Sequence, residues 1–516
     1  MSSQRSKSST SSSLLFPLAA GAAAATALLC YVYSEDPIGL KVKVKQKLHR
    51  VPDGGWPILG DLVGAGKRVL WRYLGLAFVL IANEVTAEMF ESIKNESFVL
   101  KFPFFEPIIF INDPNIVEYI LKTKFAVFEK GPIFRSRAQD VLGHGIFNSD
   151  GERWKSQRKL AANIFNVKNF KDFVNEVFSS EMDIFSDVLS NHVTFGGEFD
   201  LQELFFRFTF DSFVKIGFGI NMGALRGEQI PFMTAFDNAQ THVFMRMLTP
   251  LWEFQEAYLG TGRQQAADVK TIREFGHKII VQKRMLGTND KENDLLSLLM
   301  RVPGEDGKTP TDELLVDYVI NFLIAGRDTT AQALSWTFFL LHKNPEARQM
   351  LEEEIETVLE GKPPSYGQIK NDMPYANAVF HEALRLYPSV PMELKQANKT
   401  ETLPCGTIIP EGAAVAWSPY AMGRTKEIWG EDAKEFKPER WLNMKRQPSP
   451  FDYPVFNAGP RVCLGKNMAE LEGCFVLVEV ARQFRIEVTR EKDVTYANSL
   501  TLPMKNGLKV KVHRRD

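Results

Sequence analysis

The chain has 516 residues, of which 44% are hydrophobic and 24% charged, and its formal net charge at pH 7 is -1. A chain of this length can bury a large core, and its balanced charge argues against a nucleic-acid partner. The four cysteines, Cys30, Cys405, Cys463 and Cys474, form no C-x-x-C pair. Their spacing argues against a zinc site and a thioredoxin-like motif, and their small number favours a reducing compartment.

Residues 14–33 form an uncharged, mostly apolar run near the N-terminus. As a helix this run would be about 30 Å long, the thickness of the hydrocarbon core of a bilayer. More lysine and arginine residues follow the run than precede it, so the positive-inside rule predicts a single-pass anchor with the remaining chain in the cytosol. The predicted divisions are a short N-terminal segment at 1–13, a transmembrane anchor at 14–33, a basic and Pro/Gly-rich hinge at 34–60, and one large domain at 61–516.

Two other interpretations of the N-terminal segment stay open. A cleaved signal peptide is disfavoured because the apolar run is long and the basic block that follows is a poor cleavage context. A mitochondrial transit peptide competes, because residues 1–33 contain many serines, Arg5 and Lys7, and no acidic residue. We favour a retained anchor in the endoplasmic reticulum membrane and keep the mitochondrion as the alternative location.

The large domain is predicted to be mainly α with small β-sheets. From about residue 150 onward, apolar residues recur at spacings of three and four, which is typical of amphipathic helices. Short strand-like runs occur at 108–111, at 413–417 and at the C-terminus. On the first of the predicted helices, Trp154 and Arg158 lie one turn apart.

A long helix is predicted over 311–344, and it contains an unusual segment. Thr311 is suited to cap its start, and Pro345 follows its end. Gly326, within the sequence AGRDTT, costs about 1 kcal/mol of helix stability relative to alanine. We expect Thr329 to donate a hydrogen bond to the Ala325 carbonyl and to bend the helix, which would open a notch.

A second helix carries Glu382 and Arg385 on one face, because they are spaced i, i+3. Taken alone, such a pair is usually a surface salt bridge that contributes little. The sequence Pro-Glu-Arg-Trp, which contains Arg440, follows further along the chain.

The segment FNAGPRVCLG at 456–465 is the most informative part of the sequence. A cysteine thiolate can ligate haem iron and push electron density that favours O–O cleavage. Gly459 and Gly465 would let the backbone approach a flat cofactor. Phe456 would shield the sulfur from water, and Arg461 would pair with a haem propionate.

Cys463 also lies just before a predicted helix, whose N-terminal dipole and amides would stabilise a thiolate. The alternative is a buried free cysteine in a glycine-containing loop. We favour the iron ligand because all the fixed residues around Cys463 fit one template.

These segments resemble five ordered motifs of the cytochrome P450 family. The pattern F-x-x-G-x-R-x-C-x-G matches at every fixed position, as do A/G-G-x-D/E-T-T/S, W-x-x-x-R and E-x-x-R. The P-E-R-F motif matches except that Trp441 replaces phenylalanine. The resemblance implies the cytochrome P450 fold and haem b, iron protoporphyrin IX, with Cys463 as axial ligand. Because animal ω-hydroxylases usually carry a covalently bonding glutamate where this chain has Ala325, we expect non-covalent haem.

The resemblance also implies residue roles. Further propionate contacts are Trp154, Arg158 and Lys395. Asp328 and Thr329 are implied as the catalytic relay that protonates bound dioxygen. A buried network that braces the cysteine loop comprises Glu382, Arg385 and Arg440. The apolar candidates for a substrate pocket are Phe322, Ala325, Val390, Leu394, Leu500 and Leu502.

The implied activity is that of a membrane-bound haem-thiolate monooxygenase that inserts one oxygen atom of O2 into an apolar substrate. Electrons would come from NADPH through NADPH–cytochrome P450 reductase, with cytochrome b5 as a second candidate partner. The segments at 147–154, 325–330 and 456–461 resemble the long-chain fatty-acid ω-hydroxylases of plants and related eukaryotes. This resemblance implies hydroxylation of a long-chain fatty acid at or near its ω end.

Other functions remain as alternatives. The same apolar pocket suits a sterol, a terpenoid or a xenobiotic. A haem-thiolate isomerase or dehydratase is disfavoured because such relatives tend to lack the acid–alcohol pair that Asp328 and Thr329 form. A non-catalytic haem binder or sensor is the third class.

Overall fold

The computed structural model describes residues 82–100, 107–165, 168–249, 251–286, 294–301 and 309–515. The predicted N-terminal segment, anchor and hinge at 1–60 lie outside these residues, and so does the start of the predicted large domain. Within the described ranges, no helix is both long enough and apolar enough to cross a membrane.

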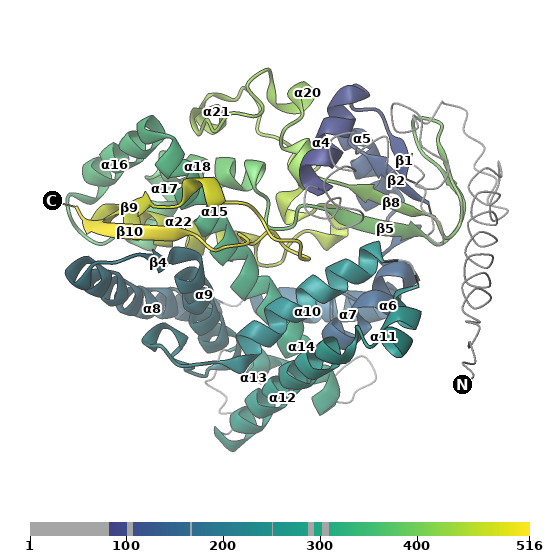
Figure 1. The fold of residues 1–516 in the computed structure, drawn as a ribbon, viewed down its shortest axis with the longest axis horizontal. Coiled ribbons are helices and arrows are strands. Elements are labelled where there is room, and N and C mark those ends of the chain that lie inside the picture. The colour runs from purple at the N-terminus through teal and green to yellow at the C-terminus, as the bar shows by residue number, and fades with distance from the viewer. Residues whose placement is uncertain are drawn as a thin grey trace, which may run out of the picture.

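Helices dominate the described chain, as the apolar spacing predicts (Figure 1). The longer ones are α7 (Gly151–Phe165), α8 (Lys168–Phe195), α9 (Leu201–Phe218), α10 (Pro231–Leu248), α12 (Arg263–Leu286), α14 (Asp312–Leu323), α15 (Thr329–Lys343), α16 (Pro345–Leu359), α18 (Pro374–Leu386) and α22 (Lys466–Gln483). The shorter ones are α4 (Ala82–Ser92), α5 (Pro114–Glu118), α6 (Gly131–Leu142), α11 (Trp252–Leu259), α13 (Leu295–Arg301), α17 (Tyr366–Asn371), α19 (Pro419–Met422), α20 (Lys426–Trp429) and α21 (Glu439–Asn443). Single turns are the π-turns η1 (Tyr119–Thr123) and η3 (Ile324–Asp328) and the 3-10 turns η2 (Ala224–Arg226), η4 (Pro454–Phe456), η5 (Gly459–Arg461) and η6 (Glu491–Asp493).

The strands form small sheets on opposite sides of the helical body (Figure 1). One sheet has the order β1 (Phe98–Leu100), β2 (Ile108–Ile111), β8 (Ala414–Trp417), β5 (Glu393–Ala397) and β3 (Phe128–Glu129). In this sheet β2 and β8 pair in parallel, with Ile108 opposite Ala414, and the other pairs are antiparallel. The other sheets are β4 (Phe199–Asp200), β10 (Lys509–Arg514) and β9 (Phe484–Val488), and the pair β6 (Glu401–Thr402) and β7 (Ile408–Ile409). The strands predicted at 108–111, at 413–417 and at the C-terminus are confirmed.

The main hydrophobic core surrounds α9 and α15, which are buried on nearly all sides. Every residue of α15 from Thr330 to Leu341 is buried, and in Figure 1 the helix runs through the middle of the molecule. Phenylalanines of α9 stack in this core, for example Phe205 against Phe185 at 5.5 Å between ring centroids. Each such buried ring contributes roughly 1.5–3 kcal/mol relative to an exposed one. We call α14, η3 and α15 together the central helix, and core side chains surround it on nearly all sides.

The helix predicted over 311–344 forms with the expected ends but with an altered centre. The Thr311 side chain accepts a hydrogen bond from the Leu314 amide, and helical structure continues to Lys343. Its centre, η3, widens into a π-turn, and the Thr329 hydroxyl donates to the Ala325 carbonyl at 2.7 Å, as predicted. Such an inserted turn is a frequent cause of helix distortion at functional sites.

The structure gives Gly326 a role that the sequence alone does not reveal. A Cβ on Gly326 would lie 1.9 Å from a ring carbon of Phe213 on α9. The glycine therefore permits close packing of α9 against η3, and its cost in helix propensity is offset by this contact.

Candidate active site

Cys463 lies on a tight loop just before α22. Its amide donates to the Phe456 carbonyl at 2.8 Å, which closes the loop, and α22 begins at Lys466. The side chain is exposed, yet burial raises the pKa of its thiol, while the Gly465 amide and the Arg158 charge lower it. The sulfur thus lies deep among protein atoms and is open on one side. An accessible sulfur with an amide donor and a nearby cation suits a metal-ligating thiolate.

The two glycines of this loop serve different needs. Gly459 has a φ of +62°, and a Cβ there would lie 2.2 Å from the Leu121 carbonyl oxygen of η1. The turn and the backbone packing therefore require glycine at position 459, in addition to the cofactor contact expected from the sequence. A Cβ on Gly465 would first meet the Cys463 sulfur, at 4.0 Å.

Phe456 is partly buried against the main core, and Lys466 lies 5.7 Å above its ring.

The predicted propionate contacts gather beside the cysteine loop. The Arg461 guanidinium lies 4.4 Å from the centre of the buried Trp154 ring. Burial lowers the pKa of Arg158, while the Cys463 thiolate raises it, so the two groups lie near enough to interact electrostatically. Lys395, on β5, is fully buried, and its Nζ has no hydrogen-bond partner among the described residues.

Arg461 has a protein partner that sequence reasoning missed. Its Nη2 donates to Asp150 Oδ1 at 2.7 Å and to the Ser149 carbonyl at 2.9 Å. Asp150 also accepts from the amides of Lys130 and Gly131. The sequence signal that pointed to Asp150 was the turn-forming run Asn-Ser-Asp-Gly at the start of the helix that carries Trp154.

The donor set fits haem. Burial lowers the pKa of Lys395 well below its usual value, and the charges of Lys130 and Arg461 lower it further. The Arg461 Nε is also buried without a partner in the described part of the chain. The unpartnered amine of Lys395 and the remaining Nε donor of Arg461 fit the carboxylates of a ligand, and a thiolate fits its iron.

Glu382, Arg385 and Arg440 lie in one buried network. Arg385 forms a two-pronged ion pair with Glu382, with both nitrogen–oxygen distances 2.7 Å, and neither side chain is exposed. Arg440 Nε lies 3.4 Å from Glu382 Oε1, and its Nη1 donates to Asp432 Oδ1 at 2.6 Å. Trp441, the departure from the family motif, donates its indole N–H to Glu382 Oε2 at 2.9 Å.

Tyr453 connects this network with the cysteine loop. Its hydroxyl donates to the His381 carbonyl of α18 at 3.0 Å, and its ring packs edge-on against Trp441 at 4.9 Å. Tyr453 directly precedes η4, which contains Phe456. Sequence reasoning from the spacing of charged residues missed these contacts of Trp441 and Tyr453.

Asp328 and Thr329 lie at the junction of η3 and α15 with separate partners. Asp328 Oδ2 accepts from Gln240 Nε2 of α10 at 2.6 Å, and Oδ1 accepts from Arg327 Nη1 at 2.7 Å. Burial raises the pKa of Asp328 to about 6, although Arg327 opposes the shift. The Thr329 hydroxyl bonds to Ala325, and Ser389 donates to the Thr329 carbonyl at 2.7 Å. An acid that titrates near neutrality suits proton transfer.

The candidate pocket residues divide into two groups. Phe322 and Leu502 are buried in the main core, and the Leu502 amide and carbonyl are fixed by Gln332 and Trp336. The remaining four are partly buried: Ala325, Val390, Leu394 and Leu500.

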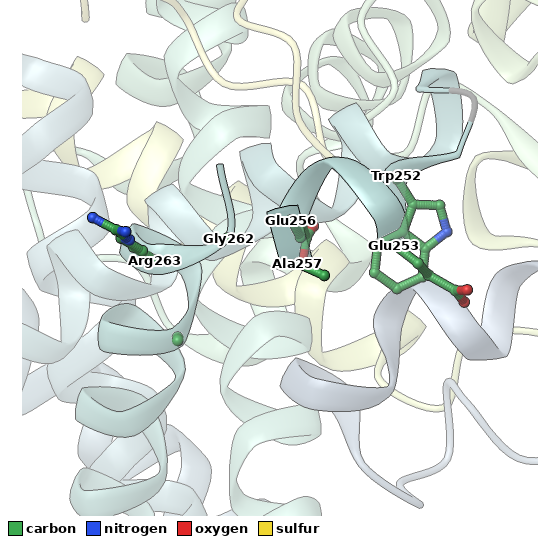
Figure 2. Close-up of a pocket in the computed structure, with 7 residues that line it drawn as sticks. Trp252, Glu253, Glu256, Ala257, Gly262 and Arg263 are labelled. Carbon is green, nitrogen blue, oxygen red and sulfur yellow. The ribbon is translucent and has the colours of Figure 1, made fainter. Parts of the chain in front are cut away.

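A surface pocket of about 470 Å³ lies elsewhere, between α11 and α12. Figure 2 shows Trp252 and Glu253 at one end and Arg263 at the other. None of the six candidate residues lines it.

Known proteins match this chain over most of its length. The family model for cytochrome P450 matches residues 68–511. Cytochrome P450 86B1 of Arabidopsis thaliana is 35% identical over 478 residues, which cover 86% of this chain and 85% of that protein. Cytochrome P450 94A2 of Vicia sativa is 35% identical over 470 residues, which cover 86% and 90%.

The fold agrees with these matches. The crystal structure of the cytochrome P450DA heme domain superposes with a TM-score of 0.75, covering 86% of this chain and 96% of that one, at 23% identity. The chain therefore belongs to the cytochrome P450 family, and the protein is a P450 monooxygenase.

Proposed function

We propose that this monooxygenase hydroxylates a long-chain fatty acid at or near its ω end. The sequence resemblance to plant ω-hydroxylases supports this substrate class, and so does the apolar lining that the partly buried Ala325, Val390, Leu394 and Leu500 would supply. The observation that carries the oxygenase chemistry is the buried acid Asp328, next to Thr329 on a distorted central helix.

The proposed cofactor is non-covalent haem b, which when bound would supply the activation of O2. Cys463 would ligate its iron through the sulfur. Lys395, Arg461 and Arg158 would neutralise its propionates, with Trp154 beneath the Arg461 guanidinium. Pairing with carboxylates would also relieve the cost of leaving Lys395 buried and unpartnered.

The proton steps are assigned to Asp328 and Thr329. Asp328, whose pKa is raised to about 6, would take up and release protons close to neutral pH and pass them towards the Thr329 hydroxyl. Thr329 already donates to Ala325, so it can accept a proton and pass on its own. The network of Glu382, Arg385 and Arg440 would act structurally by bracing the cysteine loop.

We further infer that residues 14–33 anchor the enzyme in the endoplasmic reticulum membrane, with the catalytic domain in the cytosol. Electrons would come from NADPH through its cytochrome P450 reductase, with cytochrome b5 as a second donor. The charge asymmetry around the apolar run supports this orientation.

The test combines two spectra with product analysis. The reduced, carbon-monoxide-bound enzyme should show the red-shifted Soret band of a thiolate ligand, and Cys463→His should lose it. Palmitic and oleic acids should then shift the ferric haem from low to high spin, and turnover with NADPH and reductase should yield the ω-hydroxy acid. A spin shift with sterols or terpenoids but not with fatty acids would overturn the proposed substrate.

A further inference from the structure

We propose that Asp237 and Gln240, on α10, are positioning residues that hold and aim the carboxyl group of Asp328. This inference rests on the proposed role of Asp328 as proton donor. It makes the placement of α10 a determinant of proton delivery at η3, although α10 and η3 are far apart in the sequence.

Gln240 makes the most direct contact. Its side-chain nitrogen donates to Asp328 Oδ2 at 2.6 Å, and both side chains are almost fully buried. Arg327 donates to the other oxygen, so each carboxylate oxygen has one donor. The amide comes from α10 and the guanidinium from η3, so the two donors move with different elements.

Asp237 acts through Arg327. Arg327 Nη1 donates to Asp237 Oδ1 at 2.6 Å, and Nη2 lies 3.3 Å from Asp237 Oδ2. The Arg327 side chain is fully buried, with its guanidinium 4.5 Å above the Phe206 ring, whereas Asp237 is about half exposed. One buried cation is therefore shared between two carboxylates, only one of which has access to water.

The spacing on α10 explains why both contacts form. Asp237 and Gln240 are three residues apart, which places them on the same face of the helix. From that face both side chains reach η3, Gln240 to Asp328 and Asp237 to Arg327, and Phe236 and Ala239 beside them are buried. Any displacement of α10 would therefore alter both contacts together.

Gln240 and Asp237 have opposite effects on the pKa of Asp328. Its neighbours are Arg327 on η3 and Asp237 and Gln240 on α10, and Glu203 on α9 acts on Arg327. The Gln240 donor lowers the pKa of Asp328, whereas the negative charge of Asp237 raises it. Removing Gln240 should make Asp328 harder to ionise, and neutralising Asp237 should make it easier.

The experiment titrates the carboxyl group directly in the full-length, haem-loaded enzyme. Infrared spectroscopy follows the protonated carboxyl band that Asp328→Asn removes. Gln240→Leu should raise the midpoint of this band by about one pH unit, a tenfold change in proton affinity, and Asp237→Asn should lower it by a similar amount. Asn238→Ala, at an exposed position on the same helix, is the matched control and should leave the midpoint unchanged.

Turnover gives the second measurement. The fraction of consumed NADPH that yields product should fall in both variants, and its pH profile should shift in the same direction as the infrared midpoint. The positioning role would be overturned if neither variant shifted the infrared midpoint. It would also be overturned if the midpoints shifted but the fraction of NADPH that yields product kept the pH profile of the wild type. Failure of the wild-type enzyme to oxidise fatty acids would instead contradict the proposed function. The infrared midpoints would then still test whether Gln240 and Asp237 control the ionisation of Asp328.

Discussion

At the scale of single residues, the site is built from charges that the protein buries at a cost. Asp328, Arg327, Lys395, Glu382 and Arg385 are all nearly or fully inaccessible. A buried ion pair balances much of its desolvation cost, but the amine of Lys395 has no such partner among the residues that the structure describes, and its pKa is lowered well below its usual value. Charges of this kind are retained where a ligand or a reaction uses them.

The raised pKa of Asp328 leads to a prediction about stability. The folded protein holds this proton with a pKa of about 6, against an ordinary value of 3.8, so ionisation destabilises the folded state. Stability contributed by the protonated acid is present below pH 4 and is lost as the pH rises through 6. Relative to Asp328→Asn, the wild type should lose about 3 kcal/mol of unfolding free energy between pH 4 and pH 7.

Urea denaturation of both proteins at several pH values measures this difference, because the contributions of all other titrating groups are the same in both proteins and cancel. A stability difference that stays constant with pH, or that grows in favour of the wild type, would contradict a raised pKa for Asp328. No further change should occur above pH 7.

The second prediction concerns Glu382. Glu382→Ala leaves Arg385 buried without its carboxylate and should cost about 3–5 kcal/mol. Because Trp441 and Arg440 also lose their acceptor, we expect loss of haem incorporation, measured as the ratio of Soret to protein absorbance. Glu118→Ala breaks an exposed pair with Lys122 and should change stability by less than about 1 kcal/mol. A Glu382→Ala protein with full haem content would count against the bracing role.

At the scale of elements, much of the fold was predictable because local signals were strong. The cap at Thr311, the strands at 108–111 and 413–417, and the back-bond of Thr329 follow from neighbouring residues. Contacts between distant elements were not predictable. Gln240 reaches Asp328 across 88 positions and Trp441 reaches Glu382 across 59, and no local periodicity encodes such pairs.

Gly326 shows how an element is shaped by its neighbour, and it gives a third prediction. Helix propensity alone favours Gly326→Ala by about 1 kcal/mol, but the new methyl group would collide with Phe213. We expect a net loss of about 1–3 kcal/mol, largely recovered in the double variant with Phe213→Ala. Gly367→Ala, on α17 with open space around it, should be neutral or stabilising. Equal effects of the two glycine substitutions in thermal unfolding would refute the packing explanation.

At the scale of the whole molecule, the site joins elements from most of the chain. α7 contributes Trp154 and Arg158, the central helix Asp328, β5 Lys395, and the loop before α22 Cys463. The main core around α9 and α15 holds the central helix, while the sheet that contains β5 lies to one side (Figure 1). Ligand binding should therefore couple to global stability, because it relieves costs that are distributed over the fold.

Lys395 tests this coupling, because its substitution should have opposite effects in the two forms of the protein. Without haem, Lys395→Met removes a buried amine whose pKa is depressed chiefly by burial and also by Lys130 and Arg461, so unfolding should require more denaturant. With haem, the same change would remove the proposed partner of a propionate, so haem should transfer faster to apomyoglobin and the holoenzyme should gain less stability from the cofactor. Lys399→Met, at an exposed position in the loop after β5, is the control and should change neither measurement. If Lys395→Met destabilised both forms equally, the lysine would be a structural residue and the cationic side of the site would have to lie elsewhere.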